Sequence, residues 1–307
     1  MNWQPSAEMH ALRARARMNQ QIRQFFAARD VLEVETPVLA SAPVSDPNIE
    51  PMCTTEQRWL QTSPEYAMKR LLCAGSGDIF QIARVFRRGE AGRRHNPEFS
   101  MLEWYRVGFD HRRLMDEVGE LVTQLLSARY PQLPRLNLSY GEAMGRYAGL
   151  EVHSASDEQI AVLGQQLAGQ DLQLSRDGWL DVIMSHQVEP SLPADTLVFI
   201  DDFPASQAAL ARVSNNTEGV AVAQRFELYC NGAELANGYH ELTDAEEQRR
   251  RFVQEAGGRP IDEYLLAALE HGLPDCAGVA MGLDRLLMLV QDSSNIADVL
   301  SFDWSRA

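Results

Sequence analysis

The chain has 307 residues, of which 45% are hydrophobic and 23% charged, and its formal net charge is -15. This length and composition fit a globular protein with a sizeable core, and the acidic balance excludes nucleic-acid binding unless basic residues gather on one face. No apolar run is long enough to cross a membrane, no signal peptide is visible, and the four cysteines are scattered without a CxxC pair. We therefore expect a cytoplasmic protein with no membrane partner, no zinc site and no disulfide framework.

The first quarter of the chain is predicted to contain a helix, a strand and a second helix. Apolar residues at spacings of three and four predict a helix over residues 6–29. They are Met9, Leu12, Ala16, Ile22 and Phe26. Four arginines off this stripe are expected to form a solvated face: Arg13, Arg15, Arg17 and Arg23. The alternating run 31–36 predicts a strand, and Ser63 and Pro64 predict the start of a helix that reaches Leu72.

The middle of the chain predicts a hairpin with a cationic loop. The runs Ile79–Phe86 and Glu98–Val107 predict two strands, and residues 87–97 between them form a polar loop rich in arginine. A helix over residues 112–129 follows, and residues 131–195 mix short helices and loops.

The last third of the chain predicts a second hairpin among helices. A short strand over 197–201 precedes the hairpin at 227–241, whose Asn231-Gly232 turn is the strongest short-range hairpin signal. The remaining elements are helices over 244–256 and 261–271, a strand over 276–281 and a final helix that opens at Gly282. Antiparallel hairpins with helices outside predict an α+β fold, in a single domain over residues 1–307, and neither a P-loop nor a Rossmann glycine motif is present.

The loop at 87–97 is the first candidate for chemistry. Its cationic or titratable residues are Arg87, Arg88, Arg93, Arg94 and His95. Guanidinium pairs hold phosphate oxygens through bidentate hydrogen bonds, and the neighbouring Phe99 could stack on a base. The alternative is a solvated, arginine-rich turn.

The hairpin at 227–241 is the second candidate, because it carries Glu227, Glu234 and Glu241. Carboxylates on half-buried strands need cations to meet them. We expect two kinds of cation here, magnesium and a substrate ammonium. The alternative is an edge hairpin with solvated glutamates.

The register of this hairpin makes a geometric demand. A two-residue turn pairs Tyr229 with Glu234 and Glu227 with Ala236, so Glu227 and Glu234 are diagonal neighbours that can share a hard cation. Strict alternation places three other polar residues on the opposite face: Asn237, Tyr239 and Glu241. Because a single site needs both sets, we predict a bulge near Asn237-Gly238.

Two further stretches carry candidate ligands. Glycines at a strand-to-helix junction in Ala277–Arg285 let phosphate come close, and Arg285 could reach a polyphosphate. The alternative is that Asp284 and Arg285 form an ordinary surface pair. Glu103 lies in an apolar strand, so its carboxylate needs a structural arginine or a substrate amine.

Together these stretches resemble the signature motifs of the class II aminoacyl-tRNA synthetases, and in detail those of the lysyl enzymes. The matching stretches are Val34–Pro37, Phe86–Phe99 and Gly282–Arg285 for the three motifs, and the segments around Glu65, Met101–Tyr105 and Ala236–Ala245 for lysine. The resemblance covers nearly the whole chain. The pattern is most similar to the bacterial branch that lysylates elongation factor P.

The resemblance implies an AMP-forming ligase that activates (R)-β-lysine, or lysine, with ATP and Mg2+ and transfers it to a lysine side chain of elongation factor P. From where the chain begins we expect no anticodon-binding OB domain, which with the acidic charge disfavours tRNA as the acceptor. The first motif implies a homodimer. Ala280 stands where lysyl-tRNA synthetases carry a glycine, and its methyl group is expected to reshape the preference between α- and β-lysine.

The resemblance also implies roles for individual residues. Arg87 and Arg285 are the expected catalytic residues. ATP would contact Arg87, Glu90, His95, Phe99, Glu227, Glu234 and Arg285, with Glu227 and Glu234 as the Mg2+ ligands. The amino acid would contact Glu65, Glu103, Tyr105, Asn237, Tyr239, Glu241 and Ala280. The family's adenine-contacting glutamate aligns with Gly89, and Glu90 comes one residue late, so the assignment of Glu90 stays open.

Three alternative functions stay open as well. They are lysyl-tRNA synthetase-like aminoacylation, small-molecule amide formation as in ammonia-dependent asparagine synthesis, and an inactive synthetase-like regulatory module. Glu103 and Glu241 favour a lysine-like substrate over aspartate. The presence of Arg87, Glu227 and Arg285 favours an enzyme over an inactive module.

Overall fold

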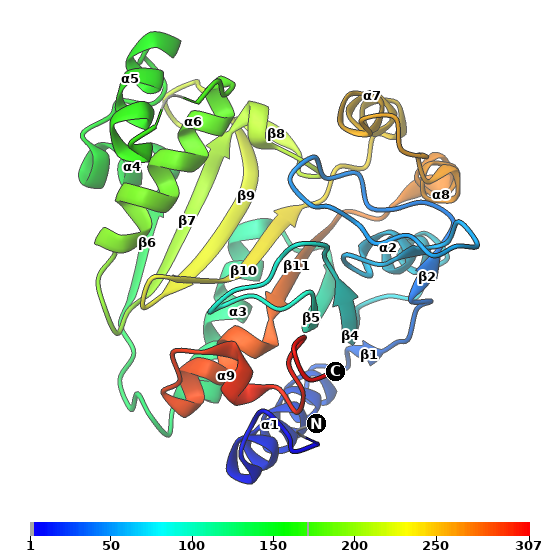
Figure 1. The fold of residues 1–307 in the computed structure, drawn as a ribbon. Coiled ribbons are helices and arrows are strands. Elements are labelled where there is room, and N and C mark those ends of the chain that lie inside the picture. The colour runs from blue at the N-terminus through cyan, green and yellow to red at the C-terminus, as the bar shows by residue number, and fades with distance from the viewer. Residues whose placement is uncertain (1–2, 171) are drawn as a thin grey trace. The chain divides into compact units, whose positions relative to one another are not determined.

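The computed structural model describes residues 3–170 and 172–307, which form two compact units (Figure 1). Unit 1 combines Met1–Pro131 with Glu241–Ala307, and unit 2 is Gln132–His240. The expected single domain over residues 1–307 stays a prediction. Within the described residues, no helix has the length and apolar content needed to cross a membrane.

Unit 1 is built on four strands in the order β1-β4-β5-β11 and on a separate pair, β2 and β3. The strands are β1 (Leu32–Glu33), β2 (Leu39–Ala40), β3 (Trp59–Leu60), β4 (Ile79–Phe86), β5 (Glu98–Val107) and β11 (Cys276–Gly282). β4 and β11 both pair antiparallel with β5, whereas β1 pairs parallel with β4. The predicted hairpin of β4 and β5 is confirmed to the residue, but the strand predicted over 31–36 shrinks to Leu32–Glu33.

Helices surround these strands. They are α1 (Met9–Ala27), α2 (Glu65–Cys73), α3 (His111–Leu126), α7 (Ala245–Glu255), α8 (Glu263–Gly272), α9 (Leu283–Gln291) and the short 3-10 helix η4 (Ile296–Val299). Figure 1 shows α2 in blue beside α8 in orange, which are far apart in the sequence. The predicted start of α2, with Ser63 as N-cap, is shifted by one residue, because the helix begins at Glu65 and Pro64 takes the N-cap position. Ser63 Oγ still accepts a hydrogen bond of 3.0 Å from the backbone N–H of Glu65.

The buried stripe of α1 differs from the predicted one. The side chains that it buries are Ala11, Ala14, Met18, Ile22, Phe25 and Phe26. Met9 is 61% exposed. The prediction chose the wrong apolar residues at the start of the helix because two stripes with helical spacing compete there, and packing decides between them.

Unit 2 is built on the strands β10, β9, β7 and β6, in that order, with β8 beside β9. The strands are β6 (Arg135–Ser139), β7 (Leu197–Pro204), β8 (Val213–Asn215), β9 (Ala221–Cys230) and β10 (Ala233–His240). β6 pairs parallel with β7, and the other pairs are antiparallel. The sequence analysis missed β6 and β8, which are short and interrupt stretches that resemble loops.

The helices of unit 2 gather beside β6 and β7 (Figure 1). They are α4 (Tyr140–Ala148), α5 (Asp157–Ala168), α6 (Arg176–Ile183), the π-helical η1 (Met184–Val188) and the 3-10 turns η2 (Glu189–Ser191) and η3 (Ala205–Gln207). Ser139 and Ser156 begin α4 and α5 with capping boxes. Trp179, Ile183 and Phe203 belong to the core between these helices and the strands. Hairpins covered by helices confirm the predicted α+β class in both units.

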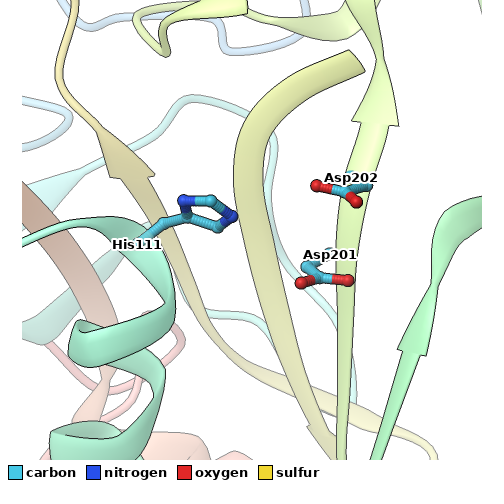
Figure 2. Close-up of side chains that lie close together, drawn as sticks. All are labelled: His111, Asp201 and Asp202. Carbon is cyan, nitrogen blue, oxygen red and sulfur yellow. The ribbon is translucent and has the colours of Figure 1, made fainter. Parts of the chain in front are cut away.

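β7 ends in an irregular segment. Its register with β9 shifts between Asp201 and Phe203, and Asp202 adopts a positive φ of 54°. Figure 2 shows the consecutive carboxylates of Asp201 and Asp202 on this strand. It also shows His111, the first residue of α3, whose helix is capped by Asp110 through a 2.7 Å hydrogen bond from the Arg113 N–H.

Candidate active site

Strand pairing in unit 1 brings the candidate amino-acid ligands to one face of its sheet. Tyr105 and Glu103 of β5 pair with Gly278 and Ala280 of β11. Side chains of paired residues, and of residues two apart along a strand, point to the same face. Phe99 lies four residues before Glu103 on β5, so the candidate adenine contact shares this face with the candidate amine ligands.

Glu103 is a buried carboxylate with two hydroxyl partners. Its side chain accepts hydrogen bonds from Ser63 Oγ at 2.7 Å and from the Tyr105 hydroxyl at 2.8 Å. Burial raises the pKa of the Glu103 carboxyl to about 8, and the negative charge of Glu65 adds to this, while the two hydroxyl hydrogen bonds oppose it. Glu103 forms no ion pair with any residue in the described part of the chain.

Lys69 supplies the cation for the other two glutamates of this cluster. Its Nζ lies 2.7 Å from Glu65 Oε1 and 2.6 Å from Glu241 Oε2. Burial lowers the pKa of the Lys69 ammonium, but the carboxylates of Glu241 and Glu65 together raise this pKa by more than burial lowers it. The pKa of Lys69 therefore lies above its usual range. Lys69 is therefore charged, and it holds two predicted substrate ligands in fixed positions.

Gly278 closes this cluster from β11. A Cβ at this position would lie 2.3 Å from Tyr105 Cε1 and 2.6 Å from Glu241 Oε1. Both distances are too short for any side chain. Gly278 thus lets Tyr105 and Glu241 meet, and it places Glu241 Oε1 beside the Tyr105 ring.

The cationic loop of motif 2 lies at the other end of the same strands. Arg87 stands over the Phe99 ring, with 5.2 Å from its guanidinium carbon to the ring centroid, and 3.7 Å from its Nη1 to Glu90 Oε1. Its buried Nε has no hydrogen-bond partner within residues 3–170 and 172–307. Phe99 and Ala280 pack against the same small apolar cluster of Ala83, Val85 and Met101.

His95 and Arg285 meet beside this loop. Arg285 Nη2 lies 2.6 Å from His95 Nε2. Because a guanidinium only donates, His95 Nε2 accepts and the imidazole carries its proton on Nδ1. Burial lowers the pKa of His95, and the charge of Arg285 lowers it further. The predicted phosphate ligands of motifs 2 and 3 are therefore together, with His95 neutral at pH 7.

Asp284 does not form the ordinary surface pair of the alternative interpretation. It is 1% exposed, and its carboxylate pairs with Arg15 of α1 and accepts a 2.7 Å hydrogen bond from the backbone N–H of Ser100. The solvated face predicted for the arginines of α1 is therefore wrong for Arg15, which is partly buried by this contact. The buried pair connects α1 to the start of α9.

The predicted hairpin of unit 2 forms, with a bulge at a different residue. Tyr229 pairs with Glu234 as predicted, but Glu227 pairs with Asn237 and not with Ala236. The register shifts between Glu234 and Ala236, so the bulge predicted near Asn237-Gly238 is wrong in position. The extra residue is the buried Leu235.

This bulge still meets the geometric demand for Asn237 and Tyr239. With Glu227 opposite Asn237, and Arg225 opposite Tyr239, the polar residues of both strands share one face. Arg225 Nε donates to Asn237 Oδ1 at 3.1 Å, and Asn237 Nδ2 donates to the Tyr239 hydroxyl at 3.0 Å. The candidate metal ligands and two candidate substrate ligands of unit 2 are therefore on the same side.

Glu227 is held by two neighbours on its own strand. Arg225 Nη2 donates to Glu227 Oε1 at 2.5 Å, and the Tyr229 hydroxyl donates to Oε2. Burial raises the pKa of the Glu227 carboxyl, and Arg225 opposes this. Carboxylates of Glu227 and Glu234, diagonal across the hairpin, offer the oxygen ligands that Mg2+ prefers, and their residual acceptor capacity fits such an ion.

Sequence reasoning missed the two internal cations, Lys69 and Arg225. Lys69 had a signal in the sequence, because among 28 lysines and arginines it is the only lysine. It also stands four residues after Glu65, the spacing of a helical ion pair. Arg225 stands two residues before Glu227 and so shares its strand face.

Known proteins of one family are similar to this chain. The model of the family described as tRNA synthetases class II (D, K and N) matches residues 2–305. A protein of Hamiltonella defensa subsp. Acyrthosiphon pisum named elongation factor P–(R)-beta-lysine ligase is 47% identical over 326 residues, which cover 100% of this chain and 98% of that protein. Proteins of the same name from Pectobacterium carotovorum and Pasteurella multocida are 45% and 46% identical, with the same coverage.

The family match spans nearly the whole chain, and these relatives are similar along their full length. The chain belongs to the class II tRNA synthetase family of the D, K and N enzymes.

Proposed function

We propose that this chain activates (R)-β-lysine, or lysine, with ATP and transfers it to a lysine side chain of elongation factor P. The observation that carries the proposal is the buried carboxylate cluster of Glu65 in α2, Glu103 in β5 and Glu241. Phe99 shares β5 with Glu103, and Arg87 directly follows β4. Buried carboxylates suit a substrate with two amines, and the arginine with its aromatic neighbour suits ATP. The shared name of the relatives supports the same reaction.

Recognition of the amino acid rests on hydrogen bonding and charge. In unit 1, Glu103 and Glu241 receive the ammonium at the end of the side chain, with Tyr105 between them, and Glu65 receives the other amine. Ala280, opposite Glu103, limits the space at the pocket. In unit 2, Asn237 and Tyr239 are proposed as further substrate contacts.

The first half-reaction forms an aminoacyl-adenylate. A carboxylate oxygen of the amino acid attacks the α-phosphorus of ATP, the bond from this phosphorus to the bridging oxygen breaks, and pyrophosphate leaves. Arg87 stabilises the charge that develops at the α-phosphate, and His95 and Arg285 hold the leaving pyrophosphate. Phe99 stacks on the adenine, and Glu90 contacts it if the loop shifts by one residue.

Glu227 and Glu234 are proposed to hold Mg2+, which when bound neutralises phosphate charge. Arg225 keeps one oxygen of Glu227 in place, so the carboxylate is oriented before the ion arrives. No side chain of the protein needs to act as a nucleophile, since positioning and charge stabilisation suffice.

The second half-reaction transfers the aminoacyl group. The amine of a lysine of elongation factor P attacks the carbonyl carbon, the bond to the AMP oxygen breaks, and the amine loses a proton. Arg88, Arg93 and Arg94 in the motif 2 loop are proposed to steer an acidic partner by opposite charge. We further propose a homodimer that acts in the cytoplasm; all four cysteines are free thiols.

The test of this function is lysine-dependent ATP–pyrophosphate exchange. Arg87→Ala is expected to lower the exchange by at least about 100-fold, because it removes a charge that the transition state requires. The matched control is Arg84→Ala, an arginine of β4 three residues earlier that is 44% exposed and pairs with Glu98. Unchanged exchange in Arg87→Ala, or an equal loss in both variants, would contradict the role of Arg87.

A further inference from the structure

The substrate cluster contains a cation of the protein's own. The nitrogen of Lys69 contacts one oxygen of Glu65 and one oxygen of Glu241, at 2.7 and 2.6 Å. The side chains of Lys69 and Glu241 are each 1% exposed, and that of Glu65 is 10% exposed. A single buried nitrogen therefore fixes the separation of two carboxylates that come from different elements.

These two carboxylates have different tasks in the proposed function. Glu65 receives one amine of the substrate, and Glu241 receives the other together with Glu103. The oxygen of Glu241 that does not contact Lys69 lies beside the Tyr105 ring, as the crowding at Gly278 requires. Lys69 thus connects the ligands for the two ends of a diamino acid.

The chemical identity of the bridging residue is informative. Elsewhere the chain uses arginine for every permanent positive charge, and Lys69 is its only lysine. An ammonium is a compact point charge with three donors, whereas a guanidinium is a wide planar fork. The ammonium of Lys69 holds the two carboxylates close around one nitrogen, whereas the wider guanidinium fork would set them further apart.

Glu103 completes the arrangement. Its hydrogen bonds come from the hydroxyls of Ser63 and Tyr105, so its charge is left to be matched by a ligand. Ser63 also accepts from the N–H of Glu65, which connects Glu103 to the same helix start. Glu103 therefore lies in one buried cluster with the two carboxylates that Lys69 bridges, which suits a substrate with two amines.

We propose that Lys69 is a positioning residue that sets the distance between the two amine-binding carboxylates, and that this distance selects a diamino acid of the length of lysine. The inference rests on the proposed function, because that function assigns the two carboxylates to the two amines. It goes beyond it by naming the group that sets the length.

The experiment compares lysine, ornithine and (R)-β-lysine in ATP–pyrophosphate exchange. Ornithine is one methylene shorter than lysine, and one methylene is worth roughly 10- to 200-fold in discrimination. In the wild-type protein we expect a ratio of kcat/KM for lysine over ornithine in that range. In Lys69→Met, which keeps size and removes charge, we expect kcat/KM for lysine to fall by about 100-fold or more and the ratio to approach one.

Chemical rescue separates a role in charge and spacing from a role in packing. Lys69→Ala removes a propylammonium group, so added propylammonium is expected to restore both the exchange and the preference for lysine. Propanol, which has the same length without the charge, is expected to restore neither. Rescue by propanol to the same extent would overturn the proposal.

Lys69→Arg keeps the inference testable if the neutral variants do not fold. It retains the charge and widens the bridge, so a folded Lys69→Arg protein is expected to have a changed ratio of lysine to ornithine. A wild-type ratio in folded Lys69→Arg or Lys69→Met would overturn the inference while leaving the proposed function intact. Absence of lysine-dependent exchange in the wild-type protein would overturn the proposed function itself.

Discussion

Replacement of Glu103 by glutamine is expected to change how stability depends on pH. Burial and the charge of Glu65 raise the pKa of the Glu103 carboxyl from an ordinary 4.5 to about 8. Below pH 4.5 the carboxyl is protonated in both the folded and the unfolded chain. Between 4.5 and about 8 the folded protein keeps a proton that the unfolded chain releases, so the free energy of unfolding falls as pH rises.

The magnitude follows from the size of the pKa change. One pH unit of pKa difference corresponds to about 1.4 kcal/mol, so between about pH 5 and pH 8 this carboxyl costs the folded state roughly 4 kcal/mol. Glu103 is only 2% exposed, so solvent screens this effect little. Glu103→Gln carries no titrating carboxyl and avoids this cost. Its stability relative to wild type is therefore expected to rise by roughly that amount across the interval.

Urea unfolding at several pH values measures this difference. The matched control is Glu120→Gln, a glutamate that is 63% exposed and pairs with Arg29 on the surface. The free energy of unfolding of the control is expected to change with pH in the same way as that of the wild-type protein. Parallel curves for wild type and Glu103→Gln would refute the argument that burial keeps this carboxyl protonated.

The same carboxyl affects substrate binding. A substrate ammonium needs the ionised form of Glu103, so the KM for lysine is expected to fall as pH rises towards 8, by at most about tenfold per pH unit. The other ionisable groups that face Glu103 are Glu65, Lys69, Tyr105 and Glu241. Lys69 and Tyr105, whose pKa values are raised, keep their protons over this range. A KM that does not change with pH would contradict the role of Glu103.

Three further predictions concern other parts of the molecule. Arg225→Met should destabilise the protein to urea by about 3 kcal/mol, because it leaves the buried carboxylate of Glu227 without its cation. Gly278→Ala should raise the KM for lysine more than tenfold, a change of about 1.4 kcal/mol or more, because its Cβ would enter the contact with Tyr105. Arg93→Lys places a free amine in an exposed loop of the proposed acceptor surface. When elongation factor P is absent, this amine should react with the aminoacyl-adenylate that the protein forms, and mass spectrometry would detect the added lysyl group.

Each of these predictions has a control or a contrary outcome. Arg250→Met removes an arginine that is 71% exposed and should leave the urea midpoint unchanged. A urea midpoint that is also unchanged in Arg225→Met would contradict the stabilising role of the buried ion pair. Gly145→Ala in α4 meets its nearest atom at 3.6 Å and should leave the KM unchanged, so a similar rise there would argue against crowding at Gly278. For the loop, the wild-type protein is the control, since its only lysine is buried and charged. If the Arg93→Lys variant forms adenylate but its loop stays unmodified, the loop does not lie close to the adenylate.

The strands β4 and β5 of unit 1 could be predicted because most of their residues are apolar. β4 and β5 begin and end where the sequence indicated, since a loop rich in arginine interrupts two buried runs. The apolar neighbours of Glu103 in the sequence likewise predicted that its carboxylate is buried. Local pattern determines both features.

The position of the bulge in the second hairpin could not be predicted from the local sequence pattern alone. The sequence predicts it near Asn237-Gly238, where glycine lowers the conformational cost. The extra residue is Leu235, where the register shifts between Glu234 and Ala236. Consecutive apolar residues such as Leu235 and Ala236 also occur in regular buried strands, so they did not mark the bulge in the sequence.

Contacts between distant segments were the hardest to predict. The pairs Lys69–Glu241 and Arg15–Asp284 join residues far apart in the sequence. No spacing rule relates such positions, and the charge of Arg15 alone suggested a solvated face. Each buried carboxylate did indicate that a cation must lie near it. For Glu241 the sequence predicts a substrate amine as this cation, and in the structure Lys69 is beside it.

The complete reaction with both acceptors tests the proposed function most directly. The protein is incubated with ATP, Mg2+ and (R)-β-lysine in the presence of either elongation factor P or tRNA for lysine, and each acceptor is analysed by mass spectrometry. We expect elongation factor P to gain one β-lysyl group on a lysine side chain while the tRNA stays uncharged. Charged tRNA with unmodified elongation factor P would contradict the proposed function.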